Sequence, residues 1–134
     1  MNVIRLCSLF LCLNVLSLPT MAGEVSIIKA ELERYSGQWI LRVTLKHDDQ
    51  GWKHYADAWR IVDKEGRVIA TRTLHHPHDT EQPFTRNLSG VNIPAATSII
   101  FIEAHDKVHG WSPDRLRIDL RKNKGARYTI NSAK

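Results

Sequence analysis

Apolar and polar residues alternate with a period of two along most of the chain after residue 22. In the segment 39–46, for example, the odd-numbered positions are apolar and most even-numbered positions are polar. This period places successive side chains on opposite faces of a β-strand. It predicts strands at residues 25–34, 39–46, 56–62, 67–74, 82–88, 98–104 and 115–121. No stretch repeats apolar residues at helical spacing over a helical length, so the chain is predicted to be all-β.

Turn-forming residues join the first four segments into two hairpins. Ser36-Gly37 separates the first pair, and Asp63-Lys64-Glu65-Gly66 separates the second. About seven strands with short connections predict a single antiparallel β-sandwich of the immunoglobulin-like or fibronectin-like kind. We expect the sandwich to span residues 23–122 and to be followed by a basic C-terminal tail at 123–134.

The first 22 residues have the pattern of a secretory signal peptide. Arg5 precedes an apolar run over residues 6–18, and Pro19-Thr20-Met21-Ala22 follows it. Cleavage after Ala22 would give a periplasmic or secreted protein with no stable membrane insertion; a retained anchor is the weaker interpretation, because the run is short for a span. Cleavage also removes Cys7 and Cys12 together with both methionines. The exported chain would then have no disulfide, thiolate or thioether, so any metal must be bound by histidine, carboxylate or backbone.

Charge narrows the choice of partners. The chain has 19 lysines and arginines against 14 acidic residues, and many of the basic ones follow residue 114. This basic segment is interpreted as a solvated terminus, with docking to an acidic partner or an anionic membrane surface as the alternative. A nucleic-acid partner is not expected, because the basic residues lack interleaved aromatic residues and export separates the protein from nucleic acid.

The histidines fall in every second connection between the predicted strands. Successive connections of an antiparallel sandwich alternate between its two ends, so the connections after the second, fourth and sixth strands should meet at one end. Those three connections contain every histidine of the chain: His47 and His54; His75, His76 and His78; His105 and His109.

A histidine cluster with nearby carboxylates favours a metal site. Imidazole suits Cu(II) and Zn(II), and a carboxylate can bind the metal or orient a ring through its second nitrogen. The candidate ligands are His47, His54, His76, His78, His105 and His109. The candidate supporting or auxiliary groups are Asp49, Asp57, Glu81 and Asp106. We therefore expect a periplasmic protein that handles or delivers copper or zinc, with a periplasmic protein as a further possible partner.

Two other functions remain open at this stage. Trp52, Tyr55 and Trp111 flank the same connections and could form an aromatic platform for a peptide or glycan, which would make the protein a binding or assembly module. A histidine–aspartate pair could instead act as a general base in hydrolysis, with His105 as its candidate. No nucleophile motif surrounds Ser112, so a non-enzymatic role is preferred.

Several short segments resemble a family of small exported proteobacterial proteins that has no settled biochemical function. The segments are His47-Asp48, Gly51-Trp52, His54-Tyr55-Ala56-Asp57, Trp59-Arg60, Arg72 to Leu74, His76-Pro77-His78, Glu81-Gln82-Pro83-Phe84-Thr85-Arg86, Ile93-Pro94, Ala104-His105-Asp106 and Val108-His109-Gly110. They span most of the chain after residue 22. The resemblance implies export and a single domain, and it implies no activity.

Overall fold

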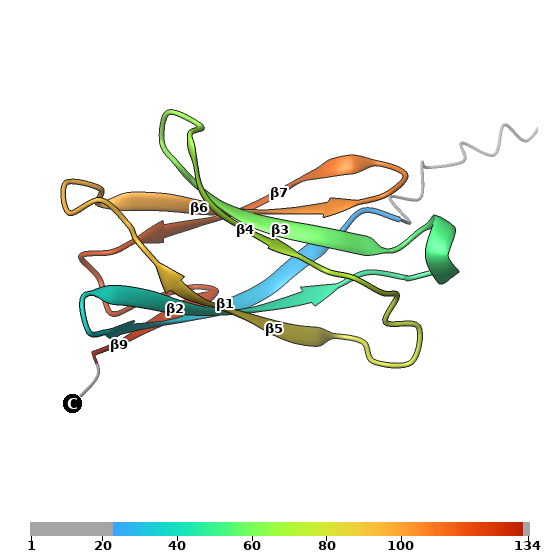
Figure 1. The fold of residues 1–134 in the computed structure, drawn as a ribbon, viewed down its shortest axis with the longest axis horizontal. Coiled ribbons are helices and arrows are strands. Elements are labelled where there is room, and N and C mark those ends of the chain that lie inside the picture. Colours follow the sequence, from blue (N-terminus) through green and yellow to red (C-terminus); the bar gives the residue numbers. More distant parts are fainter. Residues whose placement is uncertain (1–22, 133–134) are drawn as a thin grey trace, which may run out of the picture.

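The computed structural model describes residues 23–132, and these residues form two packed β-sheets (Figure 1). The predicted signal peptide lies outside the described residues. The strands are β1 (Ser26–Tyr35), β2 (Gln38–Lys46), β3 (Ala56–Asp63), β4 (Val68–Thr73), β5 (Phe84–Val91), β6 (Ile99–Asp106), β7 (Gly110–Asp119), β8 (Lys124–Gly125) and β9 (Tyr128–Ser132). A single 3-10 turn, η1 (Gly51–Lys53), precedes β3. The all-β sandwich predicted from the sequence is confirmed.

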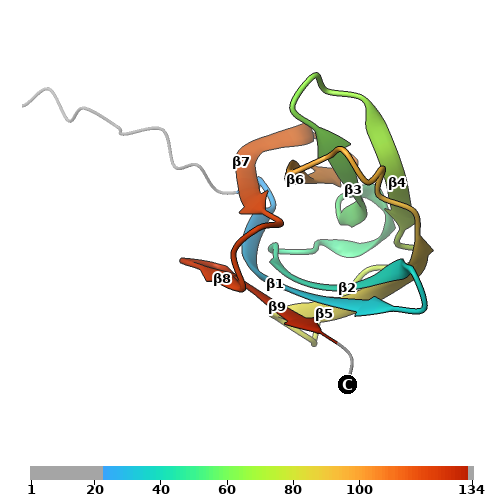
Figure 2. The same cartoon turned by 90° about the vertical axis from the view of Figure 1, so that its left-hand side faces the viewer.

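The two sheets divide the strands unequally. One sheet has the order β5-β2-β1-β9-β8 and the other the order β4-β3-β6-β7. All neighbours are antiparallel except β1 and β9, which run parallel with Ala30 opposite Tyr128. Figure 2, a view from one end, shows the two sheets curving around a common interior.

The fold continues past residue 122, where the sequence placed the start of a tail. Strands β8 and β9 come from that segment and extend the five-stranded sheet, and Tyr128 packs into the core. One basic residue of the segment is fixed by polar contacts, since Arg127 pairs with Asp114 at 3.0 Å and donates to the Ile27 carbonyl. The segment is too short for alternation alone to mark it as a strand, which is why the pattern missed it.

The core follows the period of two in the sequence. Leu41, Val43 and Leu45 of β2 face Ile61 and Ile102 of the opposite sheet within one continuous cluster, and all five are fully buried. Trp59 on β3 is the largest of the fully buried side chains. A shift of one residue would turn each strand's apolar set outward, so this core fixes the register of the strands.

The connections gather at two opposite ends of the sandwich (Figure 1). The histidine pole comprises the β2–β3, β4–β5 and β6–β7 connections together with the chain that leads into β1. The turn pole comprises the β1–β2, β3–β4 and β5–β6 connections and the end of β7. Contacts between connections support this grouping, since Gly51 N–H donates to Asp79 Oδ1 at 3.3 Å and Asp106 lies beside His54.

Candidate metal site at the histidine pole

Strand ends bring the polar side chains of the histidine pole together. His47 directly follows β2, and His54 lies two residues before β3. Asp106 is the last residue of β6, and His109 immediately precedes β7. Because β3 and β6 are paired neighbours with Ala56 opposite Asp106, the carboxylate of Asp106 reaches the loop that carries His54.

Three of these residues form a compact group of metal-ligating atoms. His47, His54 and Asp106 each offer one such atom, and all three atoms lie within 4.8 Å of one another. The rings of His47 and His54 meet edge to face with centroids 4.9 Å apart. His54 Nε2 lies 3.3 Å from Asp106 Oδ1. That nitrogen is buried and has no hydrogen-bond partner among residues 23–132.

His109 borders this group. Its ring centroid is 5.1 Å from that of His54, and its Nδ1 lies 3.1 Å from Asp106 Oδ1. About a third of its side chain is exposed, so it lies between the buried group and the solvent. We refer to His47, His54, Asp106 and His109 as the inner cluster.

Asp106 remains ionised although it is completely buried. Burial alone would raise its pKa. The backbone N–H groups of His109 and Val108 oppose this effect by donating to Oδ1 at 2.8 and 2.9 Å, and the His109 side chain does so as well. The net result is a pKa below the ordinary value of an aspartate. The inner cluster therefore contains a carboxylate that can bind a cation without first losing a proton at neutral pH.

Asp49 contacts the inner cluster through the His47 ring and links it to the neighbouring connections. Its Oδ1 contacts His47 Nδ1 at 2.5 Å and accepts the Ala56 N–H at 3.0 Å. Its Oδ2 accepts the His78 N–H at 2.6 Å. One buried carboxylate thus joins the β2–β3 connection to the β4–β5 connection and fixes the orientation of the His47 ring.

His76 and His78, predicted as metal ligands, form a separate pair. The ring of His78 is stacked on that of Phe84, with centroids 4.0 Å apart. The ring of His76 also contacts that of His78, with centroids 4.6 Å apart. Both ring nitrogens of His78 are buried without a partner among the described residues. Burial, followed by the charges of Arg86 and His76, lowers the pKa of His78, so this ring is kept neutral. Asp49 separates the pair from His47, since it contacts both loops.

His105 and its expected support, Asp57, also lie apart from the inner cluster. His105 Nδ1 contacts Asp57 Oδ1 at 2.5 Å, and both side chains are partly exposed. The period of two explains the separation, because His105 and Asp106 are consecutive in β6 and must face opposite sides of the sheet. Asp106 shares the buried face with Ile102 and Ala104. This parity was readable in the sequence and would have favoured Asp106 over His105.

The remaining predicted groups have other partners. Glu81 pairs with Arg86 at 3.0 Å. Trp52 packs against Tyr55 with centroids 6.0 Å apart. Trp111 instead packs against His105, beneath the guanidinium of Arg60 at 3.7 Å. Of the three aromatic side chains expected to form one platform, Trp52 and Tyr55 contact each other, whereas Trp111 packs against His105 and Arg60.

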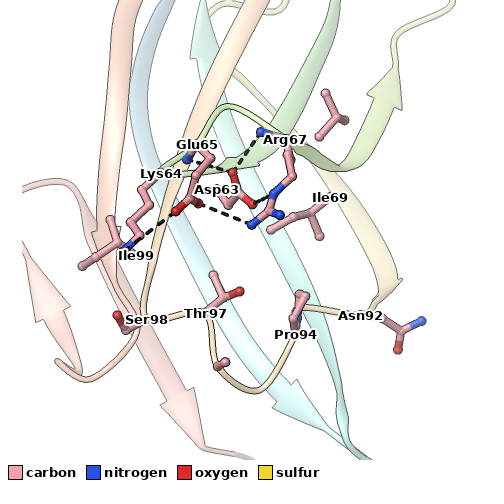
Figure 3. A pocket seen from close by; sticks show the side chains of 12 residues that line it. Asp63, Lys64, Glu65, Arg67, Ile69, Asn92, Pro94, Thr97, Ser98 and Ile99 are labelled. Carbon is pink, nitrogen blue, oxygen red and sulfur yellow. Dashed lines mark hydrogen bonds and ion pairs between the residues drawn. The ribbon is translucent and has the colours of Figure 1, made fainter.

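The turn pole carries a hollow that contains no histidine. A pocket of about 540 Å³ opens there between the β3–β4 turn and the β5–β6 connection (Figure 3). Its wall includes Asp63 with its partner Arg67, and Thr97 and Ile99 on the other side. In Figure 3 the charged side chains of this pocket bond to each other.

Comparison with known proteins gives one informative relative. A protein of Halomicrobium mukohataei with the name "Putative lipoprotein" is 32% identical over 97 residues, which is 72% of this chain and 47% of the relative. The matched region thus spans about half of the relative's length. No family model matches the chain, and no solved structure matches it. Within residues 23–132, no helix has the length and apolar character needed to cross a membrane.

Proposed function

We propose that this protein binds a divalent transition metal, Cu(II) or Zn(II), in the inner cluster. His47, His54 and Asp106 would supply three ligands, and His109 would be the fourth side chain. One observation carries the proposal: the buried Nε2 of His54 has no hydrogen-bond partner within residues 23–132 and lies 3.3 Å from the buried carboxylate of Asp106. A buried polar atom of this kind requires an explanation, and a bound cation between the two groups supplies it.

The donor set supports these metals. Imidazole nitrogen with one carboxylate oxygen is a common ligand combination for Zn(II) and also suits Cu(II). Asp49 on His47 Nδ1 has the place of the carboxylate that orients a metal-bound histidine and leaves its Nε2 to the metal. The described chain offers no sulfur ligand, so a soft Cu(I) site is not proposed.

A role in metal handling or delivery outside the cytoplasm is the physiological part of the proposal. Its support is the predicted signal peptide together with the name of the Halomicrobium relative, which describes a lipoprotein. The inner cluster lies at the end of a rigid sandwich and is bordered by the partly exposed His109, which gives the metal a short route to solvent or to a partner protein.

Native mass spectrometry with elemental analysis tests the proposal. Untagged protein would be purified from a periplasmic fraction without chelator and then titrated with Zn(II) and Cu(II). We expect one ion per chain and at least a tenfold loss of affinity in His54→Gln. His76→Gln is the matched control, because His76 is exposed and its Nδ1 bonds its neighbour's carbonyl, Pro77 O, at 3.0 Å.

Two results would overturn the proposal. One is a protein that takes up neither added ion. The other is an affinity that falls as far in His76→Gln as in His54→Gln, because the ion would then be bound outside the inner cluster.

A further inference from the structure

The main chain at Gly23, just before β1, lies against the inner cluster. The Gly23 carbonyl oxygen is 2.7 Å from His47 Nε2. The same residue packs against the His109 ring, since a Cβ placed on Gly23 would lie 2.6 Å from His109 Cε1. Two residues on, Ser112 Oγ–H donates to the Val25 carbonyl at 2.7 Å in a buried bond. This segment is therefore anchored to β7 and brings Gly23 onto two of the four cluster residues.

The two contacts of the His47 ring do not fit a neutral imidazole. Its Nδ1 faces the carboxylate of Asp49 at 2.5 Å, and its Nε2 faces the Gly23 carbonyl at 2.7 Å. Both partners are acceptors, whereas a neutral imidazole has only one N–H to donate. One of the two contacts would then bring two lone pairs together. A cation at Nε2 removes the conflict, because nitrogen and carbonyl oxygen can both bind it while Nδ1–H donates to Asp49.

We propose that the main-chain carbonyl oxygen of Gly23 is an additional ligand of the metal bound by the inner cluster. The inference rests on the proposed function and adds a backbone oxygen to its side-chain ligands. The two atoms lie 2.7 Å apart, and they would separate to about 3.0–3.4 Å as adjacent ligands that each lie about 2.0–2.2 Å from one ion. The unpartnered Nε2 of His54 favours a metal over a lone proton, because one proton on His47 would leave His54 unsatisfied.

A side chain does not fit at this position, because a Cβ on Gly23 would lie 2.6 Å from Cε1 of the His109 ring. A substitution would therefore displace the Gly23 main chain, the His109 ring or both, while His47, His54 and Asp106 keep their identity, so the carbonyl itself must be observed directly.

Selective isotope labelling reads this carbonyl directly. Gly-Glu occurs once in the sequence, at Gly23-Glu24, so protein labelled with [1-¹³C]glycine and [¹⁵N]glutamate gives one carbonyl-to-amide correlation. Ala-Glu also occurs once, at Ala30-Glu31 in β1, and [1-¹³C]alanine labelling supplies the matched control. On addition of one equivalent of Zn(II), we expect the Gly23 carbonyl to move downfield, as a metal polarises the C=O bond, while the Ala30 carbonyl stays in place.

A pair of variants gives the second measurement. Gly23→Ala should weaken Zn(II) binding about tenfold, equivalent to about 1.4 kcal/mol. Gly37→Ala is the control, because Gly37 lies in the β1–β2 turn, away from the inner cluster, with nothing within 4 Å of its Cβ position. It should bind Zn(II) as the parent protein does.

The outcomes separate this inference from the proposed function. If Zn(II) binds with the expected dependence on His54 but the Gly23 carbonyl does not shift, the backbone ligand is wrong and the metal site stands. If Zn(II) does not bind at all, the proposed function fails first. Equal affinities of Gly23→Ala and the parent protein would also overturn the backbone ligand.

Discussion

Both poles of the sandwich contain buried carboxylates, and the two poles satisfy them with different partners. At the turn pole, Asp63 Oδ1 accepts the N–H groups of Glu65 and Arg67, and its Oδ2 accepts Arg67 Nε at 2.7 Å. Asp119 is bound in the same way by the backbone and guanidinium of Arg121. At the histidine pole, Asp49 and Asp106 also accept backbone N–H groups, but their side-chain partners are histidines.

The two kinds of partner differ in whether they retain an atom that can bind a metal after pairing with the carboxylate. A guanidinium only donates, and at the turn pole its charge is neutralised by the carboxylate that it binds. An imidazole has a second ring nitrogen, which can bind a metal once the first is held by a carboxylate. Carboxylates that stabilise turns in the same way therefore form ion pairs with arginine at the turn pole, where no metal-binding atom is left. At the histidine pole they leave imidazole nitrogens that can bind a metal. Predictions that exchange or remove these partners test this comparison.

The largest effect is expected from Asp49→Ala. The change leaves the Ala56 and His78 N–H groups and His47 Nδ1 without their buried acceptor. With unsatisfied buried donors at about 1–3 kcal/mol each, we expect a loss of roughly 3–5 kcal/mol in the free energy of unfolding, measured by urea denaturation. Asp49→Asn, which keeps one acceptor oxygen, should lose less and remain folded.

The matched change at the turn pole is Asp63→Ala. It removes a carboxylate that also binds two backbone N–H groups, but Arg67 and the turn around it are exposed and can bond to water. We expect a clearly smaller loss than in Asp49→Ala. Equal losses would show that the two poles do not differ in the way described here.

Stabilisation by metal is the second effect. A ligand that binds only the folded state at a free concentration of 100 times its Kd adds about 2.7 kcal/mol of stability. We expect Zn(II) to raise the thermal midpoint of the parent protein and of Asp119→Asn. In Asp106→Asn the rise should be largely lost, because the ionised ligand of the inner cluster is gone. Calorimetry of the three proteins with and without Zn(II) gives the comparison, and a full rise in Asp106→Asn would contradict it.

The third effect is a dependence on pH that comes from His78. The pKa of this ring is lowered in the folded state, chiefly by burial, from its ordinary value of 6.5. The unfolded chain therefore takes up the proton first as pH falls, and stability declines below about pH 6.5 down to the pKa of the folded state. Urea titrations of metal-free protein between pH 7.5 and 5 should show this decline, and His78→Phe should reduce it. A slope that is unchanged in the variant would assign it to other groups.

Much of this arrangement was accessible from the sequence. The period of two predicted all seven long strands, and their alternating direction placed the histidine-bearing connections at one end. The same period also distinguishes Asp106 from His105, because Asp106 has the parity of the buried residues of β6. That signal was present but was outweighed by the usual preference for histidine over aspartate as a transition-metal ligand.

Other features depend on packing that no local pattern encodes. The separation of His76 and His78 from His47 arises because the Asp49 carboxylate occupies the space between their loops. The approach of Gly23 to His47 joins residues 24 positions apart through the path of the chain into β1. The pairing of β9 with β1 similarly joins the two ends of the domain. Each of these contacts is set by tertiary structure, so only the assembled fold shows it.

The smallest effect is expected where the turn pole loses its guanidinium. The Arg121 side chain, which is largely exposed, lowers the pKa of Asp119 through its hydrogen bonds. A carboxyl group with a lowered pKa stabilises the fold above its ordinary value of 3.8, and this stability is lost as pH falls below that value. Arg121→Gln should therefore change the unfolding free energy only slightly at pH 7 and should weaken the acid dependence between pH 4 and 2. Zn(II) affinity should be unaffected, because Asp119 and Arg121 lie at the opposite end of the sandwich from the inner cluster. A change in Zn(II) affinity comparable to that of Asp106→Asn would mean that the two poles are coupled through the core, and the contrast between a closed ion pair and an available imidazole would no longer be local.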